Sequence, residues 1–280
     1  MVQAQKSLGK KFEYMKDIAG IDLNKKEIIL AKPTKKFSII VPALNEEHTI
    51  RDLIVNIENE MKSLYSQNDF EIIVIDDGSN DFTFELVSNI KSIIVHRNER
   101  NMGKGYSMRK GIRHAQGKYI AFIDADGSHT VKDLIKGFKL IERLELYEIQ
   151  ERPFLITGVR FRNGNHGTTL LNKVGNKLYS LIGIILWHKD INDLTCGLRF
   201  AKKSDLVKFN LTSSRYTIEV EMMAECLRRK VTIIQMPIDA LQRRYGTSGI
   251  RTMKEGIILP ISFVLASMKI FSIITKRISI

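Results

Sequence analysis

The sequence predicts an α/β fold with a doubly wound, mostly parallel central sheet. Two observations predict it. Between residues 37 and 124, short apolar runs alternate with segments that have a helical pattern. These runs are apolar throughout, which is typical of strands buried on both faces of a parallel sheet. Such an alternation gives a Rossmann-like architecture, in which ligands bind beyond the carboxyl ends of the strands.

The first half of the chain is expected to hold four strands, with a helix after each of the first three. The predicted strands are FSIIVP (37–42), FEIIVID (70–76), KSIIVH (91–96) and KYIAFID (118–124). The predicted helices cover about 45–64, 81–90 and 103–115. The second half is less regular, with strands expected over 154–161, 196–202 and 231–238 and helices over 168–187 and 217–229.

The chain of 280 residues is long enough for one large domain with extensions. Residues 1–35 are expected to form a basic N-terminal extension. The main domain is expected over 36–255, in two halves, 36–127 and 128–255. The remaining residues, 256–280, are a mostly apolar tail.

The tail favours an amphipathic helix that lies in a membrane interface. Pro260 and Lys269 interrupt its apolar run, and Lys269 would lie in the middle of a spanning helix. On a helical wheel, Ser262, Lys269, Ser272 and Lys276 share one side, so basic groups can face lipid headgroups. A helix packed on the domain's own core and a spanning helix are the alternatives.

The net charge of +13 favours an anionic partner, such as nucleic acid, acidic lipid headgroups or a phosphorylated substrate. The two cysteines, Cys196 and Cys226, lack metal-type spacing, and the N-terminus shows no apolar signal region. A reducing, cytoplasmic-side location is therefore expected. No nucleic-acid-binding signature accompanies the charge, so a basic nucleic-acid-binding protein remains only a non-enzyme alternative.

Asp124-Ala-Asp126 is the central motif. The two carboxylates follow a buried strand directly and can face one divalent cation and a diphosphate bound to it. Mg²⁺ and Mn²⁺ favour carboxylate, phosphate and water oxygens. Asp124 and Asp126 are therefore the candidate metal ligands.

Two further motifs follow strands at the same predicted edge. One carboxylate of Asp76-Asp77 could bind a nucleobase or ribose, while the other caps the next helix. In NMGKG (101–105), the glycines would let the backbone approach phosphate and Lys104 would supply positive charge. The spacing is not that of a P-loop.

Four motifs in order, VPALNEE (41–47), VIDDGSND (74–81), NMGKG (101–105) and DADGSH (124–129), resemble glycosyltransferase family 2, which has the GT-A fold. In the second half, segments 158–160, 193–199 and 243–248 together with Glu221 resemble its polyprenyl-phosphate branch. That branch includes dolichyl-phosphate mannose and glucose synthases. The resemblance covers about residues 37–255.

The resemblance implies a role for each matching residue. The nucleotide side would use Pro42, Ala43, Glu46, Asp76, Asp77, Lys104 and Asp124. The acceptor phosphate would be held by Arg160, Lys173, Asn176, Arg199 and Arg243. Chemistry would rest on Asp126, Asp193, Arg160 and Arg199, with Mg²⁺ or Mn²⁺ as the cofactor.

The chemistry of such an acceptor agrees with these residue types. A lipid monophosphate is largely dianionic at pH 7 and needs no strong general base. It needs cationic positioning beside a second phosphorylated group, which arginine supplies through its planar set of donors. Ser128 departs from a glutamine frequent in mannose synthases, and this departure with the Thr-Cys-Gly segment (195–197) favours a UDP-sugar over a GDP-sugar.

The sequence therefore predicts an inverting transferase at the cytoplasmic face of a membrane. It would move glucose, mannose or N-acetylglucosamine from a nucleotide-sugar to polyprenyl (dolichyl) phosphate. The alternative enzyme is a family 2 transferase that acts on a glycan hydroxyl, with Asp193 as the base.

Overall fold

A computed structural model describes residues 32–147, 152–160 and 191–239, together with Leu181, Ile184 and Leu241. The chain divides into two compact units, Met1–Thr34 and Lys35–Ile280, and every element below belongs to the second. Its described residues form a seven-stranded sheet of order β3-β2-β1-β4-β6-β5-β7. The strands are β1 (Lys35–Ala43), β2 (Phe70–Asp76), β3 (Ile94–Arg97), β4 (Gly117–Phe122), β5 (Phe154–Val159), β6 (Arg199–Lys202) and β7 (Thr232–Pro237).

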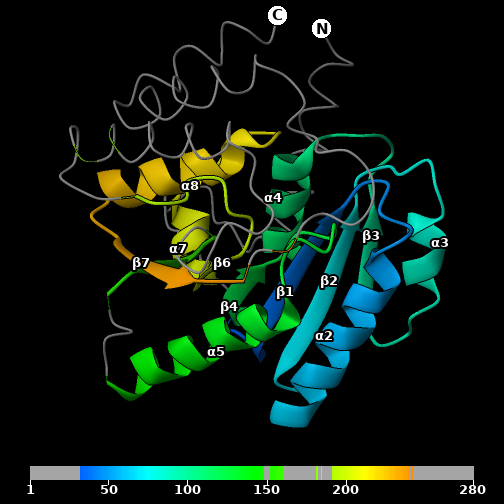
Figure 1. Cartoon of the computed structure of the whole chain (residues 1–280), viewed down its shortest axis with the longest axis horizontal. Helices are drawn as coiled ribbons and strands as arrows, with labels where there is room; N and C mark the ends of the chain where they lie inside the picture. The colour runs from blue at the N-terminus through cyan, green and yellow to red at the C-terminus, as the bar shows by residue number, and fades with distance from the viewer. Residues whose placement is uncertain are drawn as a thin grey trace, which may run out of the picture. The chain divides into compact units, whose positions relative to one another are not determined.

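Helices cover both faces of the sheet. In Figure 1, α2 and α5 lie on one side of the sheet, and α4, α7 and α8 lie on the other. The described helices are α2 (Ile50–Leu64), α3 (Thr83–Ser88), α4 (Lys104–His114), α5 (Val131–Leu146), α7 (Lys203–Lys208) and α8 (Thr217–Arg228). This is the doubly wound arrangement that the sequence predicts.

The strands are buried on both faces because successive side chains point to opposite sides of the sheet. On β1, Phe37, Ile39 and Val41 belong to the hydrophobic core beneath α2 and α5. Ile40 belongs to the second core, with Met108 of α4. All four strand residues are fully buried, so the prediction drawn from their continuous apolar runs is confirmed.

One reversed strand fixes which residues share an edge of the sheet. β1 pairs in parallel with β2 and β4, whereas β6 is antiparallel to both β4 and β5. β5 consequently runs in the same direction as β4. The register places Arg199, at the start of β6, between Phe122 and Thr157. Arg160, which follows β5, therefore emerges at the same edge as Asp124, which follows β4.

Two described helices, α5 and α7, are missing from the sequence prediction. The start of α5 has a typical capping residue, since the Thr130 side chain accepts a hydrogen bond from the Asp133 backbone N–H. The third strand begins at Ile94 rather than at residue 91, because Ile93 still closes a turn onto Ile90.

Several expectations fall outside the described residues. They concern the extension 1–35 apart from its last few residues, the tail 256–280, and the helix over 168–187 apart from Leu181 and Ile184. Within the part of the chain that the structure describes, no helix is both long enough and apolar enough to cross a membrane.

Candidate functional site

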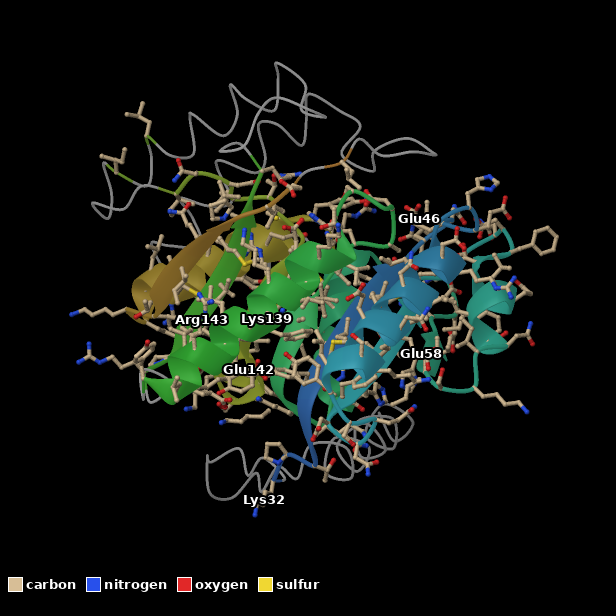
Figure 2. The ribbon with its side chains drawn as sticks, turned by 60° about the horizontal axis from the view of Figure 1, so that its bottom comes forward. Lys32, Glu46, Glu58, Lys139, Glu142 and Arg143 are labelled. Atoms are coloured by element: carbon tan, nitrogen blue, oxygen red, sulfur yellow. The ribbon has the colours of Figure 1, made fainter. Side chains whose placement is uncertain are left out.

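The candidate site occupies the carboxyl edge of the sheet, where the loops after β1, β2, β3 and β4 meet. Figure 2 shows Glu46 at this edge, where the chain leaves β1 and turns into α2, while Glu58 lies farther along α2. Strand pairing brings the carboxyl ends of three strands together here, since Ala43 of β1 pairs with Asp76 of β2, and Asp76 pairs with Arg97 of β3. The motifs that the sequence separates by tens of residues are therefore neighbours.

The loops after β1 and β2 hold each other through reciprocal hydrogen bonds. The Asn45 N–H donates to Ser79 Oγ (2.9 Å), and the Asn80 N–H donates to Asn45 Oδ1 (2.9 Å). The Phe82 N–H donates to Glu47 Oε2 at 3.0 Å. Asn45 has a φ of 55°, in the left-handed region that Asn tolerates better than most residues. The geometry of one loop thus depends on the side chains of the other.

Asp77 organises the loop that follows β3. Its buried carboxylate accepts hydrogen bonds from Asn98 Nδ2 (2.7 Å), the Met102 N–H (2.9 Å) and the Gly103 N–H (2.8 Å). The residue Asp77 is only 3% exposed, so its carboxylate faces the protein rather than solvent. Asp77 therefore positions the loop of the expected nucleoside pocket, and its carboxylate does not lie on the surface where a ligand would contact it.

Asp76 is fully buried, and its partner is Arg97, which the sequence analysis did not single out. Arg97 Nε lies 3.0 Å from Asp76 Oδ2 as an ion pair, and its other end donates to the Ser79 carbonyl at 2.8 Å. The guanidinium also lies 4.7 Å from the centre of the Phe84 ring. The polar run after the third strand was the available signal, but nothing in it pointed to Arg97 itself.

A hollow of about 500 Å³ opens between these loops. Its wall is formed by the loops after β1, β2 and β3, and it includes Asn45 and Arg97. Its lining residues are Leu44, Asn45, Gly78, Ser79, Asn80, Arg97, Asn98, Glu99, Arg100 and Asn101. The predicted residues Pro42 and Ala43 end β1 beside it, and the Ala43 carbonyl accepts from the Asp77 N–H at 2.8 Å. A polar hollow at this edge suits a nucleoside.

Asp124 lies in a network of charged groups. Its Oδ1 is 2.6 Å from Lys104 Nζ, and its Oδ2 is 3.7 Å from His129 Nε2. Lys104 also contacts Glu219 Oε1 at 2.7 Å. Burial alone would raise the pKa of Asp124, but Lys104 and His129 hold it well below its ordinary range. Asp124 is therefore an anion at neutral pH, as a metal ligand must be.

Asp126, the second acid, lies at the turn beyond β4 and is partly exposed. Its Oδ1 accepts from the Ser128 N–H at 3.0 Å. Thr49 of the neighbouring loop donates to the Ala125 carbonyl at 2.7 Å, which fixes the backbone between the two acids. Two partly exposed carboxylates one residue apart fit a hard divalent cation whose other ligands are phosphate and water oxygens.

In the ranges that the structure describes, no group of three or more His, Cys, Asp or Glu side chains is arranged to hold a metal ion.

The glycines of NMGKG pack against another segment of the chain. A Cβ at Gly103 would lie 2.4 Å from the Ser214 carbonyl oxygen, and one at Gly105 would lie 2.3 Å from that of Ser213. These glycines therefore admit the 213–215 backbone, and their predicted approach to phosphate stays a prediction. Lys104 likewise reaches two carboxylates, so its predicted phosphate contact stays a prediction.

Arg160 and Asp193 form a close ion pair where the chain leaves β5. Arg160 Nε lies 2.7 Å from Asp193 Oδ2, and a terminal nitrogen lies 2.8 Å from Oδ1. The same end of Arg160 donates to Thr195 Oγ1 at 3.0 Å. Burial opposes its charge, yet Asp193 raises the pKa of Arg160, which stays cationic. Asp193 is completely buried, whereas the Arg160 side chain is 22% exposed.

Arg199 does not lie where an acceptor phosphate could reach it. It is completely buried, and its three guanidinium nitrogens donate to the carbonyls of Cys196, Glu219 and Leu194. The expected phosphate contact is thus at odds with this geometry, which makes Arg199 a brace inside the domain. The other predicted acceptor contacts, Lys173, Asn176 and Arg243, lie outside the described residues.

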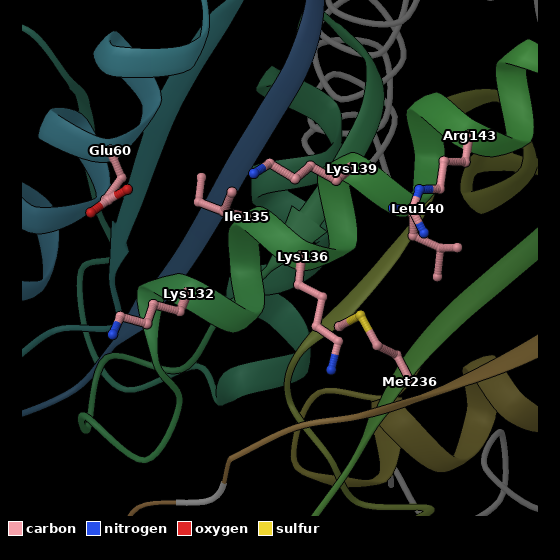
Figure 3. Close-up of a pocket in the computed structure, with 8 residues that line it drawn as sticks. All are labelled: Glu60, Lys132, Ile135, Lys136, Lys139, Leu140, Arg143 and Met236. Carbon is pink, nitrogen blue, oxygen red and sulfur yellow. The ribbon is translucent and has the colours of Figure 1, made fainter.

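A second hollow, of about 540 Å³, is lined mainly by α5, with one residue each from α2 and β7. Figure 3 shows Lys132, Lys136, Lys139 and Arg143 along α5, with Glu60 across from them on α2. No residue predicted for catalysis or binding lines it. The candidate site is therefore assigned to the carboxyl edge.

Comparisons with known proteins identify related sequences. A family model described as "Glycosyl transferase family 2" matches residues 38–209. Glycosyltransferase AglJ of Haloferax volcanii is 28% identical over 211 residues, which cover 75% of this chain and 64% of the relative. Dolichyl-phosphate beta-glucosyltransferase ALG5D of Trichomonas vaginalis is 28% identical over 226 residues, covering 75% and 67%. The chain thus spans about two thirds of the length of these relatives.

Among solved structures, glucosyl-3-phosphoglycerate synthase from Mycobacterium tuberculosis, in complex with Mn²⁺, UDP and phosphoglyceric acid, has a similar fold. The TM-score is 0.60 at 20% sequence identity, and the match covers 84% of this chain and 78% of that one. This similarity confirms the predicted fold class, the GT-A-like α/β architecture.

Proposed function

Since the chain belongs to glycosyl transferase family 2, whose model matches more than half of it, we propose that it transfers a sugar from a nucleotide-sugar to a polyprenyl phosphate at the cytoplasmic face of a membrane. The donor proposed is a UDP-sugar, and the product is a lipid-phosphate-linked sugar with inverted configuration. One observation carries the proposal. Two acids for a cation–diphosphate group and the partly exposed, cationic side chain of Arg160 share one edge of the sheet.

The donor side follows from the hollow beyond β1, β2 and β3. Its loops are held in place by Asp77 and by the Asn45–Asn80 contacts before any ligand binds. A preorganised pocket limits the ordering that binding requires. Arg97, fixed by Asp76, presents donors toward the base or ribose.

Asp124 and Asp126 would hold Mg²⁺ or Mn²⁺ between them and the diphosphate. When bound, such a cation offsets the negative charge that develops on the leaving nucleoside diphosphate. The chain's part is to hold both carboxylates in place. Lys104 and His129 hold Asp124 and lower its pKa, and the Ser128 N–H holds Asp126 through Oδ1.

On the acceptor side, Arg160 would bind the lipid phosphate. Asp193 fixes the guanidinium through two contacts, so the group is oriented without help from substrate. A phosphate dianion placed there is already a nucleophile, and arginine reduces its repulsion by the donor diphosphate. The relative from Trichomonas vaginalis, a dolichyl-phosphate beta-glucosyltransferase by name, supports this class of acceptor.

The alternative, transfer to a glycan hydroxyl, would need Asp193 as a general base. Asp193 is completely buried, and both of its carboxylate oxygens accept hydrogen bonds from Arg160. A base must reach the proton that it removes. The geometry therefore favours the phosphate acceptor, which needs no base.

The test is transfer of radiolabelled sugar into an organic-extractable lipid. Purified chain would be incubated with dolichyl phosphate in detergent, Mn²⁺ or Mg²⁺, and labelled UDP-glucose, UDP-N-acetylglucosamine or GDP-mannose in separate reactions. We expect cation-dependent labelling of the lipid with a UDP-sugar. Label that appears in a water-soluble glycan, with none in the lipid, would instead support the hydroxyl acceptor.

A further inference from the structure

The ammonium group of Lys104 is shared between two carboxylates of unequal surroundings. Nζ lies 2.6 Å from Asp124 Oδ1 and 2.7 Å from Glu219 Oε1. The Asp124 side chain is 23% exposed, whereas that of Glu219 is 3% exposed. Lys104 begins α4 and Glu219 lies in the first turn of α8, so the contact joins two helices on the same face of the sheet.

One carboxylate oxygen of Glu219 can accept a further hydrogen bond from an ammonium group. Its second oxygen, Oε2, is buried and accepts no hydrogen bond from any residue that the structure describes. Buried carboxylate oxygens without a partner are rare because their desolvation is unfavourable. This oxygen is therefore a second acceptor for the ammonium group that already touches Oε1.

The Lys104 side chain is only 13% exposed, so its ammonium group depends on the two carboxylates for its contacts. A charged ammonium cannot remain buried without a carboxylate partner at an acceptable free energy. A cation that takes Asp124 from Lys104 thus requires another partner for Lys104.

We propose that Glu219 is a positioning residue that takes over the Lys104 ammonium group when a divalent cation binds Asp124. In the metal-free protein Lys104 neutralises Asp124 and holds its carboxylate in place. On cation binding, Lys104 moves from Asp124 onto both oxygens of Glu219, which frees Asp124 Oδ1. The inference rests on the proposed function, since it assumes that Asp124 binds the cation.

This exchange predicts that two single variants change the affinity for Mn²⁺ in opposite directions. Glu219→Gln removes the second partner and leaves Lys104 tied to Asp124, so it should weaken Mn²⁺ binding by roughly tenfold, the effect of losing one charge-assisted hydrogen bond. Lys104→Met removes the competitor and should tighten binding. The double variant should regain at least the wild-type affinity, because no ammonium group then needs Glu219.

The experiment measures the Kd of Mn²⁺ by electron paramagnetic resonance on the full chain, with and without UDP. Matched controls are Glu225→Gln, on the same helix but ion-paired to Arg228, and Lys203→Met, whose ammonium donates to the Ala115 carbonyl. Both controls should retain the wild-type Kd. Thermal unfolding of each variant without Mn²⁺ identifies those that fail to fold, and the double variant, which removes both charges, covers a failure of Lys104→Met.

The outcomes separate the inference from the function on which it rests. A wild-type chain that binds no Mn²⁺, with or without UDP, would overturn the metal role and the inference together. Mn²⁺ binding that Glu219→Gln leaves unchanged would overturn the exchange alone. Weakened binding that Lys104→Met fails to restore in the double variant would also overturn it, since a merely structural Glu219 predicts that result.

Discussion

Gly197 faces the carboxylate of Asp124 so closely that a Cβ at residue 197 would lie 2.2 Å from Asp124 Oδ2. Real side chains do not approach each other at this distance, and the Asp124 carboxylate cannot shift freely because Lys104 holds its other oxygen. The turn before β6 therefore shapes the position of the first acid. Glycine at this place is required by space rather than by backbone conformation.

Gly197→Ala is expected to displace the Asp124 carboxylate and reduce turnover by about 100-fold, the usual effect of a misplacement near 1 Å in a catalytic site. The kinetics of sugar transfer at saturating donor would measure it. The unfolding midpoint serves as the control for a general loss of structure. Turnover at the wild-type level would show that the acid tolerates the methyl group and that the contact is unimportant.

Asp126→Asn should abolish turnover while the protein stays folded, because the amide keeps the shape but loses the charge that a divalent cation needs. Transfer assays and circular dichroism would check the two parts of this expectation. Asp69→Asn, on the exposed turn before β2, is the matched control and should transfer sugar normally. Full activity of the Asp126 variant would refute its metal role.

Arg160→Ala should raise the KM for the lipid phosphate far more than the KM for the nucleotide-sugar. It should also destabilise the domain by about 3 kcal/mol, because Asp193 would remain buried without its partner. Arg160→Lys keeps a charge but loses the paired contacts, and an intermediate KM is expected. Equal increases in both KM values would argue against an acceptor role.

Arg199→Met is expected to act on stability rather than on substrate binding. Three buried carbonyls lose their donors, which should lower the free energy of unfolding by about 3 kcal/mol or more. Urea denaturation would measure this loss. A variant of wild-type stability with a selectively raised KM for lipid phosphate would restore the role that the family resemblance implies.

His114 should make the domain less stable as the pH falls from about 6.5 to about 4. It stacks on His96 with ring centres 3.9 Å apart, and burial, His96 and nearby Arg113 lower its pKa to about 4 from an ordinary 6.5. In this interval the unfolded chain binds a proton that the folded chain does not, so the free energy of unfolding decreases.

The measurement is urea denaturation at pH 7 and pH 5. The loss of stability between the two should be smaller in His114→Gln than in the wild type. His48→Gln, at a histidine that is 63% exposed, should behave like the wild type. An identical pH response of the His114 variant and the wild type would contradict the assignment.

The sequence was most informative where one local pattern determined one element. The four apolar runs of the first half became β1 to β4, because a strand buried on both faces must be apolar at every position. The place of Asp124 and Asp126 beyond β4 followed from the same reasoning. The helix α5 is absent from the sequence prediction, although Thr130 caps it and its buried residues recur at helical spacing.

The partners of each side chain could not be predicted, because they come from segments far apart in the chain. Nothing local to Lys104 indicates Glu219, which follows it by more than a hundred residues. The same holds in part for Arg199, for which the family resemblance implied a phosphate contact. Two of its carbonyl partners are local, but the third, that of Glu219, lies on α8. Residue type indicated charge, and only the fold indicated where that charge is used.

The reversed direction of β6 divides the sheet into two parts that carry different groups of site residues. β3, β2, β1 and β4 form a continuous parallel block that carries every donor loop, whereas Arg160 and Asp193 belong to segments beside or beyond the reversed strand. Hydrogen bonding across β4 and β6 involves backbone groups, so it is indifferent to side-chain identity. Substitutions beyond β6 that spare Gly197 and Glu219, the residues facing Asp124 and Lys104, are therefore expected to alter the Arg160 flank and to leave the loops after β1, β2 and β3 intact.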